Sequence, residues 1–389
     1  MKIKHLFWVL FSLNLLNYID RQVLYAVFPL VQTDLHLTDF QLGTLASAFM
    51  LVYMCYAPLV GYWADRFPRP RLIGGSALLW SGATFLCGLA TSYLSLLVPR
   101  AFIGVGEGGF TTIAQPYLAE HYPKEKHASM LALFGLALPI GSALGYIIGG
   151  VLGQHGGWRL AFMVAGVPGV LLGLAAWTRL TDTARTACYV RPALRDYLPL
   201  LTNRPFLRVC IAQAMSTFVM GGLSAWMPMY LHRYMNLDAA KAGTYFGALV
   251  IGGGAVGTLL GGKLAARLFT RTKNAYYYVI SAAFVGALPF CWFGLSVRQP
   301  GVVLACLGGA LVCLFIPTGA IAAALVATTS EKIRSMAFAL NIFIIHLLGD
   351  ALSPTLVGWA SDAWSLKTAV FGCTLLLLPG AWASWRARS

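Results

Sequence analysis

Long apolar stretches fill almost the whole chain, and they limit its fold more than any other feature of the sequence. Short connections carrying proline, glycine or charged residues separate them. A helix of about 20 largely apolar residues crosses the ~30 Å hydrocarbon core of a membrane. We therefore expect an all-α membrane protein with twelve transmembrane helices. The expected helices cover residues 6–30, 40–64, 71–91, 94–120, 128–153, 158–180, 205–234, 240–268, 275–297, 301–328, 333–360 and 365–386.

The composition excludes an ordinary soluble domain. Only 11% of the 389 residues are charged and 58% are hydrophobic, whereas soluble domains carry about 25% charged residues. Most of the surface must therefore face lipid. The 41 glycines are also typical of helices that approach one another closely in a membrane.

Basic residues gather in alternate connections, and this pattern predicts the orientation of the chain. If the N-terminus is cytoplasmic, most basic residues lie in cytoplasmic connections. The opposite side holds only Arg159, Arg233, Lys241, Arg298 and Lys367. The positive-inside rule then places both termini in the cytoplasm, in a multi-pass protein of the cell inner membrane. The net charge of +15 follows from this topology without a nucleic-acid partner.

The first apolar stretch differs from a cleaved signal peptide. It carries Asn14, Asn17, Asp20 and Arg21 in its middle, and no small-residue cleavage site follows it. We interpret it as a retained first helix. The eight cysteines lack metal-ligand spacing, so we expect no metal, no cofactor and no disulfide framework.

A polar and basic connection over residues 181–204 divides the chain into halves of similar length. We predict a six-helix bundle over residues 1–180, a cytoplasmic linker, and a second six-helix bundle over residues 205–389. This arrangement resembles the parallel repeat of the major facilitator superfamily, whose substrate site lies at the interface of the repeats near the middle of the membrane.

The connection after the second expected helix carries a recognisable motif, from Gly61 through Asp65 and Arg66 to Arg69. It resembles the superfamily signature G-x-x-x-D-R-x-G-R-R/K, although proline replaces the second glycine and separates the last two arginines. We expect these four residues to form a cytoplasmic latch in which Asp65 pairs with arginines. The alternative is a positive loop that only sets topology.

Ionisable residues inside the first expected helix suggest function, because such groups are costly at bilayer depth. Asn17, Arg21 and Tyr25 are spaced by four and share one stripe. Asp20 is adjacent to Arg21, and an adjacent acid and base can neutralise each other. A static ion pair is the alternative to a binding or coupling role.

The fourth and fifth expected helices combine charge with glycine. Arg100 and Glu107 are two turns apart on one face, and Glu107 lies in the string Gly104-x-Gly106-Glu107-Gly108-Gly109. A carboxylate that exchanges a proton as its surroundings change is what proton coupling requires. The glycine-rich stretch 139–150 predicts a tight packing face. It also resembles the fifth-helix motif of some antiporters.

The eleventh expected helix holds His346 and Asp350 four residues apart. Pro354 follows, and we expect it to break the hydrogen-bond ladder of the helix nearby. The pair shares one helix face and can form a hydrogen bond. A histidine beside a carboxylate is a natural proton acceptor in the physiological range.

Together these strings resemble the Spinster family of major facilitator transporters. They are joined by a string from Trp226 to Arg233, and all occur in the expected order over nearly the whole chain. The resemblance implies an amphipathic, lipid-like substrate of the lysophospholipid or sphingoid-phosphate type. It also implies that Asp20, Arg21, Arg100, Glu107 and His346 line the central cavity or couple protons. The tenth helix departs from animal members, since an alanine run follows Pro317.

We therefore predict a secondary active transporter that works by alternating access and is coupled to protons. Its expected partners are the substrate, protons and membrane lipids, and it is expected to act as a monomer. Two alternatives within the superfamily are a drug/proton antiporter and a small organic-anion transporter. A membrane-embedded enzyme is disfavoured because no nucleophile–base pair or metal-ligand set is visible, and a non-transporting receptor remains a further alternative.

Overall fold

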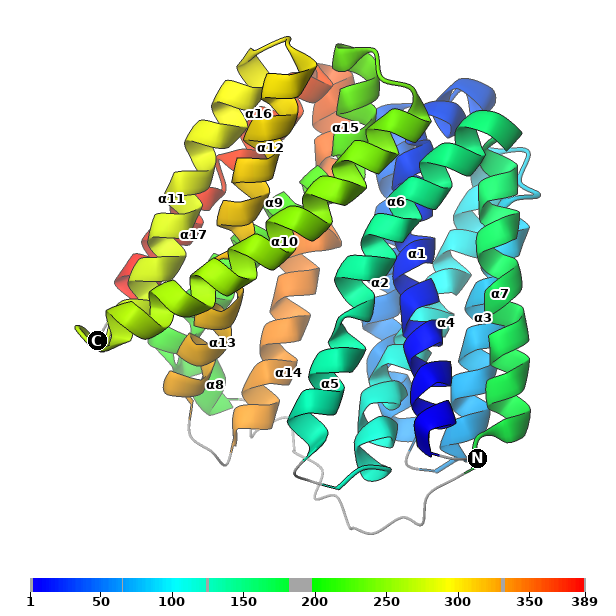
Figure 1. Cartoon of the computed structure of the whole chain (residues 1–389), viewed down its shortest axis with the longest axis horizontal. Helices are drawn as coiled ribbons and strands as arrows, with labels where there is room; N and C mark the ends of the chain where they lie inside the picture. Colours follow the sequence, from blue (N-terminus) through cyan, green and yellow to red (C-terminus); the bar gives the residue numbers. More distant parts are fainter. Residues whose placement is uncertain (1–2, 65, 124–125, 182–197, 330–332, 388–389) are drawn as a thin grey trace. The chain divides into compact units, whose positions relative to one another are not determined.

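Helices make up nearly all of the chain that the computed structural model describes, which is everything except residues 1–2, 65, 124–125, 182–197, 330–332 and 388–389. Figure 1 shows the helices in chain order. The helices are α1 (Ile3–Leu35), α2 (Asp39–Ala64), α3 (Arg69–Cys87), α4 (Tyr93–Glu120), α5 (His127–Gly135), α6 (Ala137–Gly156), α7 (Trp158–Arg179), α8 (Leu198–Thr202), α9 (Arg204–Met235), α10 (Ala239–Phe269), α11 (Ala275–Ser296), α12 (Pro300–Phe315), α13 (Pro317–Ala327), α14 (Arg334–Ile345), α15 (Ser353–Ala363), α16 (Leu366–Thr374) and α17 (Leu377–Arg386). A π-helical turn, His346–Asp350, lies between α14 and α15.

A helix forms over each expected segment, but the fifth, tenth, eleventh and twelfth segments are each broken in two. The breaks separate α5 from α6, α12 from α13, α14 from α15 and α16 from α17. A proline follows each break closely: Pro139, Pro317, Pro354 and Pro379. Proline lacks the N–H that bonds the carbonyl four residues earlier, and its ring clashes with that carbonyl. The short helix α8 is a further difference, because the sequence predicted only a linker there.

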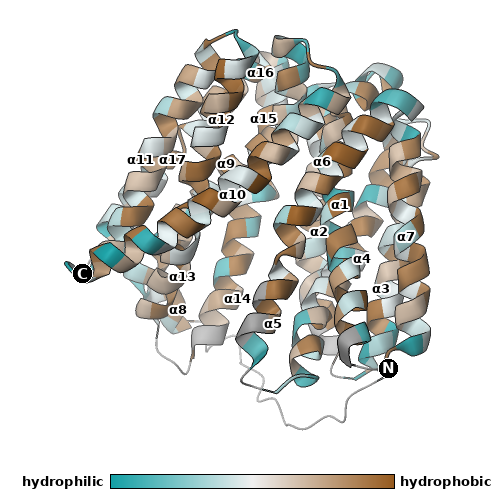
Figure 2. Ribbon diagram, in the orientation of Figure 1, coloured by the Kyte–Doolittle hydropathy of each residue, from teal (hydrophilic) through white to brown (hydrophobic). Residues whose placement is uncertain are grey.

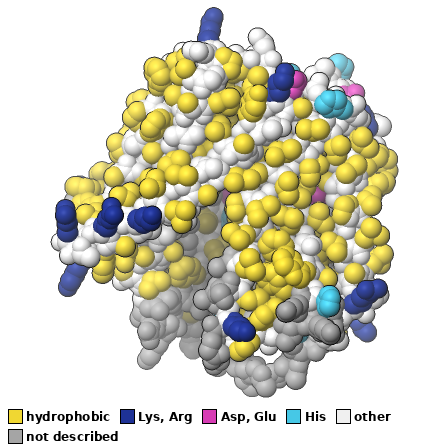
Figure 3. Space-filling view, viewed as in Figure 1, with side chains coloured by type: hydrophobic (Ala, Val, Ile, Leu, Met, Phe, Trp, Pro, Cys, Tyr) yellow, Lys and Arg dark blue, Asp and Glu magenta, His cyan; other side chains and the backbone are white. Residues whose placement is uncertain are grey.

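The surfaces of the helices are those of a membrane protein. Nine helical segments among the described residues are long and apolar enough to cross a membrane. Hydrophobic residues run along the helices in Figure 2, and hydrophobic side chains cover most of the face in Figure 3. Leu94, Leu171 and Leu259 are each more than 60% exposed. In water such a surface would aggregate, so it faces lipid.

By their contacts the residues fall into two compact units. One contains Met1–Thr186 together with Met227–Gly247, and the other contains Ala187–Trp226 together with Ala248–Ser389. The first unit therefore holds α1 to α7 plus the end of α9 and the start of α10. The predicted boundaries at residues 180 and 205 stay a prediction, and most of the predicted linker lies outside the described residues.

Glycines on α6 bring it against α1 in the first unit. A Cβ atom added to Gly141 would lie 2.6 Å from the carbonyl oxygen of Leu15, and one added to Gly149 would lie 2.9 Å from Cα of Val23. Such close approach of two backbones requires small residues. The glycine-rich stretch 139–150 thus packs on α1, the helix that carries Asp20 and Arg21.

Candidate functional site

Two acids and two bases meet inside the first unit, on α1 and α4. Nε of Arg21 donates a hydrogen bond to Oε2 of Glu107 at 2.7 Å, in an ion pair whose carboxylate side is fully buried. Asp20 is also buried, and its Oδ2 accepts a hydrogen bond from the Thr84 hydroxyl of α3 at 3.0 Å. Arg100 of α4 is fully buried, and its guanidinium lies near the same Phe49 ring as that of Arg21. We call Asp20, Arg21, Arg100 and Glu107 the charge cluster, and its formal charges sum to zero.

The charge cluster corrects one expectation from the sequence. Asp20 and Arg21 were expected to neutralise each other as neighbours. Instead Asp20 bonds to Thr84 on α3 and Arg21 pairs with Glu107 on α4. Successive residues of an α-helix point about 100° apart, so adjacent side chains do not face one another.

Arg100 is the least satisfied member of the charge cluster. Its side chain is fully buried, and none of its three nitrogens has a hydrogen-bond partner among the described residues. Oδ1 of Asp20 and Oε1 of Glu107 also lack such a partner there. Buried polar groups in proteins are nearly always hydrogen-bonded. The cluster is therefore built to take up further hydrogen-bonding groups, such as water, protons or a ligand.

Aromatic rings surround the two guanidinium groups. The Arg21 guanidinium lies 5.0 Å from the ring centres of both Phe49 and Tyr53, and that of Arg100 lies 5.3 Å from the ring of Phe49. A cation over a ring face is stabilised by about 0.5–2 kcal/mol. Phe49 is thus shared by both cations, although sequence reasoning did not identify it.

The glycines around Glu107 let α4 pack closely on α2 and α3. A Cβ atom added to Gly108 would lie 3.0 Å from the Tyr53 carbonyl oxygen of α2, and one added to Gly106 would lie 2.7 Å from the Ser76 carbonyl oxygen of α3. The alternating glycines let α4 lie closely against both neighbours. Glu107 lies between these two glycines in sequence, and the close packing keeps its side chain fully buried.

Two other residues predicted on the same stripe of α1 differ in their surroundings. Asn17 is fully buried one turn before Arg21. Tyr25 is partly exposed one turn after it, and its ring packs edge-on against Phe28 at 5.6 Å. The structure therefore places Asn17 in the buried part of α1 beside the charge cluster.

A second group of predicted residues lies in the second unit. Nδ1 of His346 lies 2.9 Å from Oδ1 of Asp350, so the expected intrahelical contact forms. It does so inside the π-helical turn, where Gly349 has a non-helical backbone (φ −104°, ψ −108°). Single π-helical turns are frequent at functional sites. We call His346 and Asp350 the histidine–aspartate pair.

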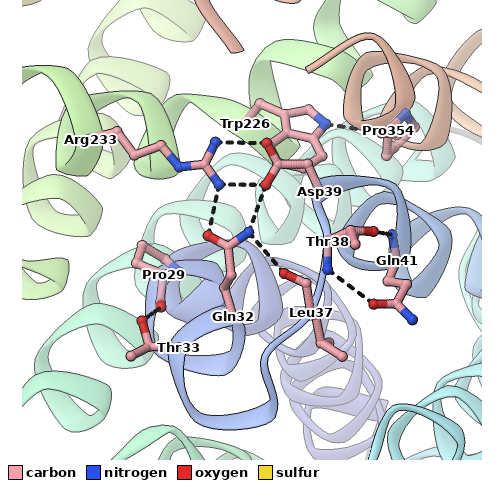
Figure 4. Close-up of polar contacts among 10 residues, drawn as sticks. All are labelled: Pro29, Gln32, Thr33, Leu37, Thr38, Asp39, Gln41, Trp226, Arg233 and Pro354. Carbon is pink, nitrogen blue, oxygen red and sulfur yellow. Dashed lines mark hydrogen bonds and ion pairs between the residues drawn. The ribbon is translucent and has the colours of Figure 1, made fainter. Parts of the chain in front are cut away.

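Trp226 is fully buried beside this turn. Its indole Nε1 donates a hydrogen bond to the carbonyl oxygen of Pro354 at 3.0 Å (Figure 4). A Cβ atom added to Gly221 would lie 2.8 Å from Cβ of Asp350, which shows how closely α9 approaches the turn. Trp226 therefore supports the kinked segment.

The predicted cytoplasmic latch can be placed only in part. Asp65 lies outside the described residues, and of Gly61 the structure gives only its place near the end of α2. Arg69 begins α3, pairs with Glu120 at the end of α4, and donates to the carbonyl oxygen of Ala64 at 3.4 Å. Arg66 is exposed. Arg69 thus ties together three helix ends within the first unit.

Comparison with known proteins gives consistent similarities. Residues 10–344 match the family model of the Major Facilitator Superfamily. The chain is 31% identical over 383 residues to the sphingosine-1-phosphate transporter SPNS2 of Mus musculus, covering 90% of this chain and 68% of that protein. It is 27% identical over 421 residues to the probable sphingolipid transporter spinster homolog 2 of Arabidopsis thaliana, covering 98% and 86%.

A solved structure with a similar fold is that of a bacterial homolog to the human lysosomal transporter Spinster, in an inward-facing and occupied conformation. Its TM-score is 0.89 at 21% identity, over 99% of this chain and 96% of that chain. The D-xylose-proton symporter has a TM-score of 0.80 at 16% identity, over 100% and 98%. Both similarities concern the fold.

Proposed function

The chain belongs to the Major Facilitator Superfamily, as a transporter of the Spinster type, and we propose that it moves an amphipathic, lipid-like anion by proton-coupled alternating access. The proposed substrate class is lysophospholipid or sphingoid phosphate, and the names of two relatives, a sphingosine-1-phosphate transporter and a probable sphingolipid transporter, support the second. We place it in the cell inner membrane with both termini cytoplasmic, because basic residues gather in alternate connections.

The charge cluster is the observation that supports this proposal best. Four ionisable side chains in membrane helices default to a functional role, because charge is costly at that depth. Arg21 is 15% exposed while its partner Glu107 is fully buried. An anionic head group that reaches Arg21 would compete with Glu107 for the same guanidinium.

That competition gives a route to coupling. When a proton neutralises Glu107, the carboxyl group no longer holds Arg21 by charge, and Arg21 becomes free to bind an anionic head group. Loss of the proton restores the ion pair and displaces the anion. Asp20, which is buried in the same unit, is the second proton acceptor of the charge cluster, and the histidine–aspartate pair is a further candidate.

Residues of the second unit suit the apolar tail. Phe343 is 45% exposed and Met220 is partly exposed, so both can contact a hydrocarbon chain. Trp226 is fully buried and bonds the carbonyl oxygen of Pro354, so its ring is not available to the tail. In the proposal Trp226 is a supporting residue, while Met220 and Phe343 make the contact.

The test uses purified protein in proteoliposomes loaded with a fluorescent lysophospholipid. Glu107→Gln and Asp20→Asn keep the shape of each side chain and remove its charge. We expect at least one of them to abolish the response of flux to an imposed pH gradient while binding persists. Asp362→Asn is the control, because Asp362 is an exposed carboxylate on α15 and lies outside the charge cluster. If flux in both variants still follows the gradient, coupling does not reside in the charge cluster.

Arg100 favours one alternative, the transport of small organic anions. Its guanidinium is fully buried and has no hydrogen-bond partner among the described residues, so a compact carboxylate suits it better than a bulky head group. Competition separates the two functions. Short carboxylates should displace the lysophospholipid poorly if the substrate is a lipid, and should displace it well if the substrate is a small anion.

A further inference from the structure

The connections α1–α2 and α9–α10 have the same local structure. His36 (φ 52°) and Asn236 (φ 54°) are the non-glycine residues with left-handed backbone among those described. Each directly follows the last residue of a long helix, as α1 ends at Leu35 and α9 ends at Met235. This conformation costs roughly 1 kcal/mol or more for such residues, so its repetition at these two positions indicates a repeated structural unit.

Side-chain hydrogen bonds also repeat when the two connections are aligned so that His36 matches Asn236. Gln32 donates to the carbonyl oxygen of Leu37 at 3.1 Å. At the matching position, Nδ1 of His232 lies 2.8 Å from the carbonyl oxygen of Leu237. The next helices are capped alike. The amide of Gln41 donates to Oγ1 of Thr38 at 3.2 Å, and that of Lys241 donates to Oδ1 of Asp238 at 2.7 Å. We call residues 32–41 the first corner and residues 232–241 the second corner.

One ion pair joins the two corners. Nη1 of Arg233 donates to Oδ2 of Asp39 at 2.7 Å, and Nη2 donates to its Oδ1 (Figure 4). Nη2 also donates to Oε1 of Gln32 at 2.7 Å, while Nε2 of Gln32 donates to Oδ1 of Asp39 at 2.8 Å. The three side chains therefore bond to one another in a closed triangle. Two-pronged bonding between guanidinium and carboxylate is strong and geometrically specific.

The two charged residues of the ion pair are not repeated, since neither has a charged counterpart in the other corner. With the same offset, Arg233 corresponds to Thr33, and Asp39 corresponds to Ala239. The second corner thus supplies the cation and the first corner supplies the anion. The Asp39 side chain is only 5% exposed, so its charge is largely withdrawn from water and depends on this partner.

Glycines extend the contact beyond the ion pair. A Cβ atom added to Gly247 would lie 3.0 Å from the carbonyl oxygen of Ala143 on α6. One added to Gly243 would lie closer still, against the Tyr146 carbonyl oxygen. The amide of Ala239 also donates to Oε1 of Gln154 at 3.2 Å. The start of α10 therefore rests on the backbone of α6.

These contacts explain why residues 227–247 belong to the unit of α1 to α7, while the remainder of α9 and α10 belongs to the other unit. We propose that Arg233, Asp39 and Gln32 form a gate latch that closes one side of the transporter and must open during each transport cycle. This inference rests on the proposed alternating access. In the proposed orientation the latch lies on the non-cytoplasmic side.

A nearby ion pair provides a matched control. Nη1 of Arg159 donates to Oδ2 of Asp34 at 2.8 Å, and Arg159 also bonds the carbonyl oxygen of Ala90. These residues lie on α1, on α7 and just after the end of α3, so the pair does not involve α9 or α10. Asp34 lies in the first corner, so loss of this pair should affect exchange in the first corner alone and leave the second corner unchanged.

The test is hydrogen–deuterium exchange on purified protein, which needs no substrate. In Arg233→Gln and in Asp39→Asn we expect amides of both corners to exchange about tenfold faster, which corresponds to about 1.4 kcal/mol of lost local stability. Peptides of α3 and α7 should be unchanged. The double variant Arg233→Asp/Asp39→Arg should recover part of the protection. Three outcomes would each overturn the proposal: unchanged exchange in the corners, faster exchange throughout the chain, or an equal effect of Arg159→Gln on the second corner.

A second variant opens the same contact by sterics. Gly243→Ala places a methyl group against the Tyr146 carbonyl oxygen, whereas Gly252→Ala on the same helix meets no atom within 4 Å. Gly243→Ala should speed hydrogen exchange in the second corner, whereas Gly252→Ala should leave it unchanged. Equal exchange rates in the two variants would contradict the latch. Transport assays then separate the two proposals. If wild-type protein moves no lysophospholipid while the exchange results hold, the proposed substrate fails and the latch stands.

Discussion

Removal of Arg100 should destabilise the fold even though its guanidinium makes no hydrogen bond to the described residues. The four formal charges of the charge cluster cancel, and Arg100→Met leaves an uncompensated negative charge among fully buried groups. Breaking a buried charge balance costs about 3–5 kcal/mol. Domains of 150–250 residues lose about 2–4 °C of melting temperature per kcal/mol. The expected decrease in Tm is therefore about 6–20 °C.

Intrinsic tryptophan fluorescence during a thermal ramp measures this decrease, with every variant compared at one scan rate because unfolding of such proteins is often irreversible. The decisive sample is the double variant Arg100→Met/Asp20→Asn, in which the charges cancel again. It should recover most of the lost Tm, since the amide oxygen of the substituted side chain can still accept the hydrogen bond from Thr84. Arg298→Met, at an exposed site, controls for loss of an arginine. A double variant no more stable than Arg100→Met would refute the charge-balance argument.

Three smaller predictions follow from packing and capping, each measured by the same thermal ramp. Gly145→Ala places a methyl group 2.8 Å from Cβ of Gln22 on α1 and should cost about 1–3 kcal/mol, whereas Gly135→Ala meets no atom within 4 Å and should be close to neutral. Trp226→Phe removes the bond to the Pro354 carbonyl oxygen and should cost about 1–3 kcal/mol. Ser92→Ala removes the capping box at the start of α4 and should cost about 1 kcal/mol.

Hydropathy predicted where the helices lie, because the need to bury about 20 residues in lipid is a property of each segment by itself. The sequence predicted the break near Pro354, but not the breaks within the other three segments, although a proline follows each one. Proline is an ambiguous signal, since Pro168 and Pro289 lie inside uninterrupted helices. Whether a proline breaks a helix depends on whether neighbouring groups satisfy the freed carbonyl, and that depends on packing.

The sequence also indicated which side chains to inspect, but not which of them meet. Asp20, Arg21, Arg100 and Glu107 were all identified, because ionisable residues in apolar helices are conspicuous. Their pairing depends on how α1 and α4 are each placed by their neighbours. The glycines of α4 bring that helix against α2 and α3, and the glycines of α6 bring α6 against α1. Thr84 and Phe49 escaped notice, because a hydroxyl or an aromatic ring in a membrane helix is ordinary.

The gate latch shows a different limit. Arg233 and Asp39 lie on the side of the predicted topology that carries few basic residues, and that scarcity was a usable signal for a pair. The repeat that brings them together was hidden, because the two corners share one identical residue at corresponding positions, Leu37 with Leu237. What repeats is the backbone, from the left-handed residue to the caps. In a fold built from repeated backbone units, the side chains make the two repeats different. A gate that acts on one side only should therefore involve residues that differ between equivalent positions, such as Arg233 and Thr33.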